Sequence, residues 1–498
     1  MAPPRVLLVS ENVPPQVNGM ARRVGQYTDG LRKRGCEVTV LHPDCAGEVI
    51  GFTNPWNFSA RMMIVRPWCY ASLLRTPFDV VHVVLPLNLS GVWILAGFKM
   101  LRALGLGNPV LIASWHCNLA SYNQDIFPAW ANDLCAQICM GLFLPVARLA
   151  DRLLVPTPST EPLLRKAFAE RWGICSNGLE VNAFNPDARS TPSGALWAKR
   201  KRDSLAAANC TSLVLCVGRL SPEKGVGARL PRLRIPCSSA SYPSLTADCP
   251  ARLPAVDLLR AMPFLDGCVL WLVGDGPARC DLEALAADGI DGSGPLPVEF
   301  WGYQHGEALS AVYTVCDLFV CPSRTETFGQ TVNEALASGC LVAVPRVGCF
   351  AEAYDGVLDT KSHMWEPGDT RDMAEAIRRQ LPRTSTPAAS NGHAAADGNG
   401  DASPRPKIKL KTWAMAVDEL LLEYTSAAAM APFGWIETGL CLAAYPFFFA
   451  FTLLISLVVL AISFTRTALG GVGVRSFVKL KVKEWRRIVP FCTRTKEA

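Results

Sequence analysis

Short apolar runs alternate with longer periodic segments along most of this chain, and no other feature limits its possible folds as strongly. In the first part of the chain the apolar runs occur at residues 5–10, 37–41, 80–85, 110–114 and 152–156. The runs have the length of strands, and the segments between them have the length and periodicity of helices. This alternation predicts an α/β fold in which a parallel sheet carries helices on both faces.

The pattern restarts after Pro186. The second set of apolar runs occurs at residues 213–217, 269–273, 298–301, 318–321 and 341–345. We therefore expect two doubly wound, Rossmann-like domains that face each other across a cleft, the first at 1–186 and the second at 187–381. In sheets of this kind ligands bind beyond the carboxyl ends of the strands, so the loops that follow the strands are the candidate sites.

Two irregular stretches interrupt the periodic chain. Residues 382–407 contain no Val, Ile, Leu, Met or aromatic residue, which is typical of a flexible linker, and we expect a helix after it at 408–430. Residues 227–255 contain five prolines, four arginines and a single acidic residue, and they break a segment that otherwise reads as one motif. We interpret this stretch as a surface insertion or as an error of the gene model.

The C-terminal part predicts contact with a membrane. Residues 439–464 contain no charged residue, and they are long enough for a transmembrane or re-entrant segment. The tail at 465–498 has nine basic and two acidic residues, which is a net charge of +7. Because the whole chain has a net charge of +6, the rest of the chain has a net charge of about −1. Apolar residues of this tail recur on one helical face between the basic ones, as in an amphipathic helix at a membrane surface. A basic tail on a nearly neutral body favours a membrane as partner and argues against nucleic acid.

The start of the chain and its cysteines indicate where the protein works. An apolar strand follows the first residues directly, without the charged start and long apolar core of a signal peptide. We therefore expect the protein to be membrane-attached with its two domains on the cytosolic side of an endomembrane, or in a plastid if a leader is missing. The 19 cysteines form no CxxC pair and have no spaced His partner, which favours buried thiols in a reducing compartment over zinc or disulfides.

A basic motif follows the first predicted strand of the second domain. The segment LVLCVGRLSPEKG, residues 213–225, leads from a strand into a glycine turn that carries Arg219 and Lys224. An arginine fork, a lysine point charge and backbone N–H groups exposed by glycines can together clamp a diphosphate. A solvated basic loop is the alternative interpretation of this motif alone.

An acidic motif follows a later strand of the same domain. In PSRTETFGQTVNEALASG, residues 322–339, Glu326 and Glu334 flank the turn at Phe328 and Gly329 that opens a helix. Both carboxylates can accept hydrogen bonds from sugar and ribose hydroxyls, and Gly329 and the helix N-terminus can present N–H groups to a phosphate. Taken alone, two glutamates at helical spacing also fit a solvated helix face.

Together the two motifs resemble family 4 of the retaining glycosyltransferases, which are two-domain enzymes of the GT-B type. VGDGP at 273–277 and NGLEVNAFNP at 177–186 add to the resemblance, which covers residues 5–380. Within the family, VNGMARRVGQY and SWHCNLASY are most similar to sulfoquinovosyltransferases and lipid mannosyltransferases. The resemblance implies that a nucleotide sugar binds mainly to the second domain and that the acceptor binds to the first.

The resemblance also implies a role for each matching residue. Arg219 and Lys224 should hold the diphosphate, and Glu334 should bind the ribose. Gly19 should lend its N–H to a phosphate, and Phe328 and Gly329 are the other donor-binding positions. His116 and Glu326 are the implied catalytic residues, which should contact the transferred sugar.

The implied chemistry needs no metal. Arg219, Lys224 and helix N-termini can stabilise the negative charge that develops on the departing nucleoside diphosphate, and the chain has no Asp-x-Asp triplet for a metal. We expect no cofactor other than the donor substrate, a UDP- or GDP-sugar. Retention follows if leaving group and acceptor share one face of the sugar, so no protein base is named. The expected function is a metal-independent hexosyltransferase that acts on a membrane lipid such as diacylglycerol.

Two other functions stay open at this point. A nucleotide-sugar epimerase can share the two-domain fold, and fold alone does not decide between them. An inactive membrane-anchored scaffold is the other alternative, because the stretch at 227–255 begins three residues after Lys224 and can displace the diphosphate loop. The presence of Arg219, Lys224, Glu326 and Glu334 favours transfer.

Overall fold

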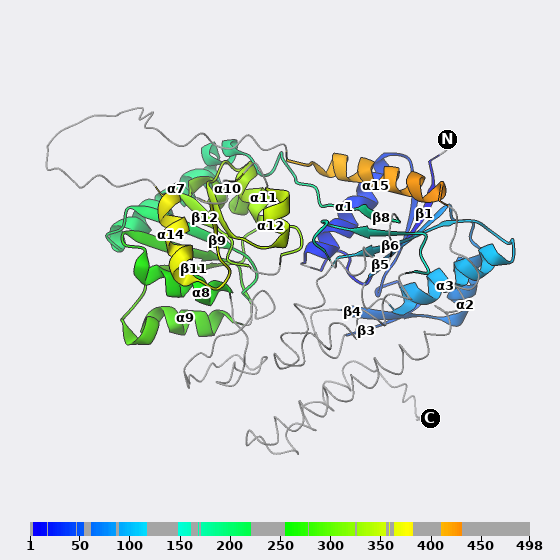
Figure 1. Ribbon diagram of the computed structural model, residues 1–498, viewed down its shortest axis with the longest axis horizontal. Coiled ribbons are helices and arrows are strands. Elements are labelled where there is room, and N and C mark those ends of the chain that lie inside the picture. Colours follow the sequence, from blue (N-terminus) through cyan, green and yellow to red (C-terminus); the bar gives the residue numbers. More distant parts are fainter. Residues whose placement is uncertain are drawn as a thin grey trace, which may run out of the picture.

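The structure of the chain is a computed structural model, shown in Figure 1. It describes residues 3–16, 18–45, 47–53, 61–85, 89–116, 148–160, 168, 171–220, 254–276, 278–323, 326–354, 358, 363–381 and 410–430. Two α/β bodies lie side by side, each built on a parallel sheet of six strands. We call them the N-terminal body, whose sheet takes its strands from residues 5–174, and the C-terminal body, whose sheet takes them from 212–365. The predicted α/β class with parallel sheets is confirmed.

The sheet of the N-terminal body has the order β2-β1-β5-β6-β7-β8, and all neighbouring strands are parallel. Its strands are β1 (Arg5–Val9), β2 (Glu37–Leu41), β5 (Val80–Leu85), β6 (Val110–Trp115), β7 (Arg152–Val155) and β8 (Trp172–Ile174). β5 is buried at all six positions, as a strand covered on both faces must be. The strand order reverses between β1 and β5, which makes this pair the topological switch point of the sheet.

Helices cover both faces of this sheet. Among the described residues up to β8, the helices are α1 (Gly19–Lys33), α2 (Pro67–Arg75) and α3 (Leu89–Ala103), and an antiparallel hairpin of β3 (Val49–Thr53) and β4 (Arg61–Val65) adjoins α3. α1 begins after Asn18, whose Oδ1 accepts a hydrogen bond from the N–H of Ala21 at 2.8 Å. Ala21, Val24 and Leu31 lie on the buried face of α1 at helical spacing. The helix N-terminus therefore points to the carboxyl edge of the sheet, directly after β1.

The sheet of the C-terminal body has the order β11-β10-β9-β12-β13-β14, and its switch point lies between β9 and β12. Its strands are β9 (Ser212–Val217), β10 (Cys268–Val273), β11 (Val298–Gly302), β12 (Leu318–Val320), β13 (Val342–Pro345) and β14 (Met364–Trp365). α8 (Pro254–Ala261), α9 (Arg279–Asp288) and α14 (Thr370–Gln380) cover one face, and α7 (Pro192–Ala207), α10 (Gly306–Val315), α11 (Gln330–Ala337) and α12 (Gly348–Ala353) cover the other. Short 3-10 helices occur at η1 (Pro186–Ser190), η3 (Met262–Phe264) and η4 (Ile290–Gly292).

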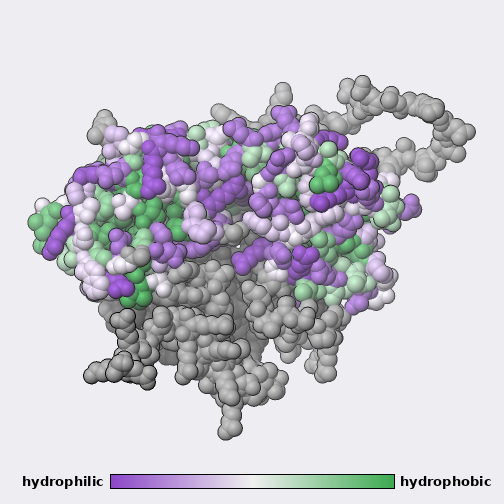
Figure 2. Space-filling view, turned by 180° about the vertical axis from the view of Figure 1, so that it is seen from behind, coloured by the Kyte–Doolittle hydropathy of each residue, from purple (hydrophilic) through white to green (hydrophobic). Residues whose placement is uncertain are grey.

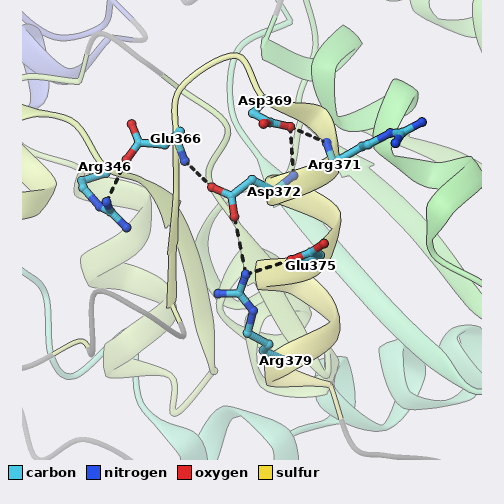
Figure 3. Close-up of polar contacts among 7 residues, drawn as sticks. All are labelled: Arg346, Glu366, Asp369, Arg371, Asp372, Glu375 and Arg379. Carbon is cyan, nitrogen blue, oxygen red and sulfur yellow. Dashed lines mark hydrogen bonds and ion pairs between the residues drawn. The ribbon is translucent and has the colours of Figure 1, made fainter.

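A network of polar contacts fixes the start of α14 (Figure 3). The carboxylate of Asp369 caps the helix by accepting hydrogen bonds from two backbone N–H groups of the first turn, at 2.9 and 3.0 Å. Asp372 accepts a hydrogen bond from the N–H of Glu366 at 2.7 Å and lies 3.4 Å from Arg379, two turns further along α14. Arg346 pairs with Glu366 at 2.7 Å and so connects the end of β13 to the same network. These contacts hold α14 against the sheet edge formed by β13 and β14.

The last described helix returns to the N-terminal body. α15 (Trp413–Ala428) lies within the segment 408–430, and it packs beside α1 on the face of the sheet opposite α3 (Figure 1). Gly30 and Gly178 allow this close approach, because a Cβ at either position would collide with Val417 or with the backbone of Trp413. The helix therefore ties the end of the described chain to its beginning.

Several predicted segments lie outside the described residues. They are the linker at 382–407, the apolar segment at 439–464, the basic tail at 465–498 and residues 227–253 of the irregular stretch, whose last two residues begin α8. Among the helices that the structure describes, none combines the length and the apolar character that a bilayer span requires.

Candidate active site

The two charged motifs of the sequence flank the switch point of the C-terminal sheet. Arg219 comes two residues after β9, and Glu326 follows β12, the strand on the other side of the switch point. The carboxyl ends of adjacent parallel strands meet at one edge, so both loops open to the same side of the sheet. Lys224, the partner of Arg219 in the basic motif, lies outside the described residues.

The loop that carries Arg219 is held by the neighbouring VGDGP segment. The N–H of Leu220 donates to the carbonyl of Asp275 at 3.0 Å, and the N–H of Ala278 donates to the carbonyl of Leu220 at 3.0 Å. Gly274 and Gly276 permit this contact, because a Cβ at either position would collide with a carbonyl oxygen of the Arg219 loop. These glycines therefore position the loop, a role that the sequence motif alone did not reveal.

The acidic motif is built around the turn before α11. Gly329 has φ 72°, in the left-handed region that favours glycine, and a Cβ there would lie 2.6 Å from a ring carbon of Phe350. Phe350 itself is fully buried in the core beneath this turn. Glu326 and Phe328 are half-buried on the loop, whereas Glu334 on α11 is only 3% exposed. The two glutamates of the motif thus occupy different environments.

Glu334 contacts both bodies. Its Oε1 accepts a hydrogen bond from Nη1 of Arg22 on α1 at 2.8 Å, and its Oε2 accepts one from the hydroxyl of Tyr313 at 3.2 Å. Burial raises the pKa of Glu334, and the charge and hydrogen bond of Arg22 act in the opposite direction. A carboxylate predicted for the ribose is therefore held by a cation from the other body.

Further contacts bring the carboxyl edges of the two sheets together. The hydroxyl of Thr157, which follows β7, donates to the carbonyl of Thr327 at 3.1 Å. The N–H of Ser159 donates to Oε2 of Glu352 at 2.8 Å. Residues at the carboxyl edge of the N-terminal sheet thus meet the acidic motif at Thr327 and α12 at Glu352. We call this region the interbody face.

Gly19 is the first residue of α1 and lies exposed at the carboxyl edge of the N-terminal sheet. Its φ is outside the left-handed region, and a Cβ built on it meets no atom within 4 Å. Neither backbone conformation nor packing in the described part of the chain thus requires a glycine here. Close approach of a ligand to the backbone is a remaining reason for glycine, in agreement with the predicted phosphate contact.

His116 follows β6 directly and is 8% exposed. Its Nδ1 contacts the guanidinium of Arg23, the residue after Arg22 on α1, and Arg23 also contacts Oδ1 of Asn177. Arg23 is itself 4% exposed, so a buried cation lies beside the predicted sugar-contacting histidine. His116 and Glu334 are thus both attached to α1, through adjacent arginines.

Glu11 is a buried carboxyl group that no sequence motif predicts. This residue lies two positions after β1 and is 7% exposed, and its Oε1 accepts a hydrogen bond from the N–H of Met63 at 3.3 Å. Burial raises the pKa of Glu11 to about 8, so the side chain is largely protonated at neutral pH. A single carboxyl group after a strand gives no sequence signal of its burial. Its place after β1 makes it a buried polar group beside the switch point of the N-terminal sheet.

Comparisons with known proteins identify the family. The family described as Glycosyltransferase Family 4 matches residues 17–182, and the one described as Glycosyl transferases group 1 matches residues 253–382. A GDP-mannose-dependent alpha-mannosyltransferase of Mycolicibacterium smegmatis is 25% identical, over 84% of this chain and 96% of its own length. A sulfoquinovosyl transferase of Arabidopsis thaliana is 24% identical, over 76% of this chain and 67% of its own.

A 2-deoxystreptamine glucosyltransferase of Streptomyces kanamyceticus is 32% identical, over 67% of this chain and 74% of its own length. The solved structure of a glycosyltransferase from Rickettsia africae has a TM-score of 0.53 and 13% identity, and the match covers 86% of this chain and 100% of that one. That likeness concerns the fold, and it agrees with two α/β bodies. The family matches and the relatives together lead to one conclusion: the chain is a glycosyltransferase enzyme and belongs to glycosyltransferase family 4.

Proposed function

We propose that the protein transfers a sugar from a nucleotide-sugar donor to a membrane lipid, with retention of the anomeric configuration. One observation carries the proposal. The Arg219 loop and the Glu326–Glu334 segment flank one switch point of the C-terminal sheet. Glu334, at the end of that segment, accepts a hydrogen bond from Arg22 on α1 of the other body. A site at the carboxyl edges of two doubly wound bodies suits a donor in one body and an acceptor in the other.

The donor is bound mainly by the C-terminal body in this proposal. Arg219 and Lys224 hold the diphosphate, with Phe328 and Gly329 at the start of α11 beside it, and Glu334 accepts the ribose hydroxyls. A GDP-sugar is the first donor to test, because the relatives from three actinobacteria are named as GDP-mannose-dependent. UDP-sugars are the second donors to test, because the sequence resemblance implies either a UDP- or a GDP-sugar.

The reacting sugar lies between Glu326 and His116 in this proposal. Glu326 is half-buried and can stabilise positive charge that develops on the sugar, while Arg219, Lys224 and the Gly19 N–H stabilise the negative charge of the leaving diphosphate. Leaving group and acceptor share one face of the sugar, so the product keeps the anomeric configuration of the donor. The acceptor hydroxyl gives its proton to the departing diphosphate oxygen on the shared face, so this scheme requires no metal and no protein base.

The lipid acceptor is supported by the surface of the N-terminal body. Seven large apolar side chains are more than half exposed on or next to β3, β4, α2 and α3, elements that adjoin one another. They are Ile50, Ile64, Trp68, Trp93, Met100, Leu104 and Leu106. In Figure 2 hydrophobic residues form groups among hydrophilic ones on the described surface of this body. Exposed apolar side chains of this size are typical of surfaces that meet a membrane or a partner.

Membrane attachment through 439–464 and the basic tail, with the two bodies on the cytosolic side, belongs to the same proposal. Attachment would bring a lipid acceptor and the acceptor side of the enzyme to one surface. The support for attachment comes from the sequence: the uncharged segment is long enough to enter a bilayer, and the basic tail suits an anionic membrane surface.

A transfer assay tests the proposal. The detergent-solubilised full chain is offered radiolabelled GDP- and UDP-sugars with diacylglycerol or a total lipid extract, and label in the organic phase is measured. Label is expected from one donor class, and Glu326→Gln should lower the rate by roughly a hundredfold because it removes a charge at the reacting sugar. Glu375→Gln, an exposed substitution on α14, is the matched control and should retain full rate.

Three outcomes would contradict parts of this account. Label that stays in water-soluble product would refute the lipid acceptor. An inverted anomeric carbon in the product, read by NMR, would refute retention. Full activity of Glu326→Gln would refute the assignment of the reacting centre.

A further inference from the structure

Arg22 is the residue through which the N-terminal body reaches the predicted ribose site. It lies three positions after Gly19 on α1, and its Nη1 is 2.8 Å from Oε1 of Glu334 on α11. The side chain of Arg22 is 34% exposed, whereas that of Glu334 is 3% exposed. The arginine therefore borders the interbody face and reaches a carboxylate that is otherwise enclosed.

Other groups hold the guanidinium of Arg22 in place. Its Nη2 lies 3.6 Å from Oε1 of Glu180, and its Cζ lies 6.0 Å from the centre of the Phe184 ring. The Asn18 cap fixes the first turn of α1, from which Arg22 projects. The orientation of Arg22 toward Glu334 is thus prepared by the fold and does not depend on a ligand.

The carboxylate of Glu334 retains acceptor capacity beside this contact. A carboxylate has about four lone-pair sites, and Arg22 and the Tyr313 hydroxyl occupy one on each oxygen. Gln330 also hydrogen-bonds to this carboxylate, so about one site is left, and a ribose hydroxyl can bind there without displacing Arg22. A hydroxyl donates a stronger hydrogen bond to an ionised carboxylate than to a neutral carboxyl group.

The charge of Arg22 bears on whether Glu334 is ionised. Burial favours the neutral form of Glu334 and raises its pKa, while Arg22, Tyr313 and Gln330 favour the charged form. Tyr313 stays neutral, because burial raises its own pKa well above the usual value. Glu180 faces Arg22 from the loop after β8 and carries the opposite charge. Arg22 is thus the cation that the described residues bring into contact with this buried carboxylate.

We propose that Arg22 is a positioning residue for the donor nucleotide: it keeps the Glu334 carboxylate charged and oriented toward the ribose hydroxyls. The inference rests on the proposed function, in which Glu334 binds the ribose. It adds a second contribution of the N-terminal body, beside Gly19, to a nucleotide site whose remaining residues belong to the C-terminal body. Because the ribose is remote from the bond that breaks, loss of Arg22 weakens donor binding and raises KM more than it lowers kcat.

Nucleotide binding as a function of pH tests this inference. Calorimetry with GDP and with UDP measures Kd between about pH 5.5 and about 8.5 for the wild type, Arg22→Ala, Arg22→Lys and Glu334→Gln. Without Arg22 the pKa of Glu334 rises further, so the Kd of Arg22→Ala should exceed that of the wild type by roughly tenfold or more at low pH. The ratio should shrink as pH rises and Glu334 ionises in the variant as well. Arg22→Lys restores the charge, so its pH profile should follow the wild type.

Controls separate this role from a structural one. Lys33→Ala changes an exposed cation at the far end of α1 and should leave Kd unchanged at every pH. Glu334→Gln removes only the titration of Glu334. The change of its Kd with pH therefore shows how much the nucleotide and the other titratable groups contribute. A loss in Arg22→Ala that is constant with pH and is not rescued by lysine would overturn the inference.

The failure of the inference is distinguishable from failure of the proposed function. If Glu334→Gln binds weakly and Arg22→Ala binds as the wild type does, Glu334 keeps its assignment and Arg22 loses its own. If the wild type binds neither GDP nor UDP, or if Glu334→Gln binds both normally, the ribose assignment and the inference about Arg22 both fail.

Discussion

Two adjacent arginines of α1 contact different groups of the interbody face. Arg22 reaches Glu334 in the C-terminal body, whereas Arg23 lies buried between His116 and Asn177. Arginine donates hydrogen bonds and accepts none, so the ring nitrogen of His116 that bonds to the Arg23 guanidinium acts as the acceptor. His116 held in this way can donate to a sugar hydroxyl and is not free to act as a base through that nitrogen. This agrees with a transfer that names no protein base.

Gly19 allows a test of a ligand contact at the scale of one residue. Gly19→Ala should leave the melting temperature unchanged or slightly higher, because the Cβ meets no atom and alanine is the better helix former. The same substitution should weaken donor binding, because the added methyl group occupies the space predicted for a phosphate.

Thermal melts and calorimetry with GDP and UDP measure the two effects separately. Gly276→Ala is the contrasting variant, since its Cβ would collide with the carbonyl of Leu220 and should lower the melting temperature. Unchanged nucleotide affinity in a stable Gly19→Ala protein would show that no ligand approaches this backbone.

At the scale of elements, α15 joins the end of the described chain to the N-terminal sheet. The hydroxyl of Tyr424 lies 2.8 Å from Nδ1 of His82, and Nε2 of His82 lies 2.8 Å from the hydroxyl of Ser114. His82 is fully buried on β5, and burial, aided by the charge of Arg23, lowers its pKa to about 3. The imidazole is therefore neutral at physiological pH and depends on α15 for one of its two hydrogen bonds.

Removal of this hydroxyl should loosen α15. Tyr424→Phe leaves one nitrogen of a buried histidine without its partner, which should lower the free energy of unfolding by about 1–3 kcal/mol. Tyr303→Phe is the matched control, because Tyr303 is 57% exposed, and it should change stability by less than about 0.5 kcal/mol. Denaturant titrations of both variants make the comparison. Equal stability of the two variants would show that the His82 contact contributes nothing to the docking of α15.

The strands were the most predictable elements, for a physical reason. The apolar runs at 80–85 and 110–114 correspond to β5 and β6, because strands of a parallel sheet are buried on both faces and so consist mostly of apolar residues. The two-residue β14 and the β3–β4 hairpin carry no such signal. The packing of α15 on the N-terminal sheet could not be read from the sequence either, since an amphipathic helix does not specify which surface covers it.

The candidate site was predictable in part. Arg219, Glu326 and Glu334 stand out because their residue types and spacing form motifs, and the structure places them beside one switch point. Arg22 and Glu11 do not, because their roles depend on burial and on the approach of segments more than 300 and about 50 residues away in the chain. Contacts of this kind follow from the tertiary arrangement of distant segments, within one body for Glu11 and between the two bodies for Arg22, which local sequence does not contain.

At the scale of the whole molecule, the residues proposed to bind and transfer the sugar come from both bodies and meet at the interbody face. The N-terminal body contributes Gly19, Arg22 and His116, and the C-terminal body contributes the Arg219 loop and the acidic motif. Glu334 and Arg22 form a direct contact between the two sets. A nucleotide bound at Glu334 should therefore change the dynamics of both bodies, although most of its contacts belong to the C-terminal body.

Hydrogen exchange of the full chain, with and without GDP or UDP, tests this claim most directly. The account predicts slower exchange in the nucleotide complex at three separate segments, residues 18–22 at the start of α1, 218–220 after β9 and 326–336 through α11. Unchanged exchange at 18–22 with protection of the other two segments would contradict a site shared by both bodies. Unchanged exchange at all three segments in a nucleotide-saturated protein would contradict the location of the donor site.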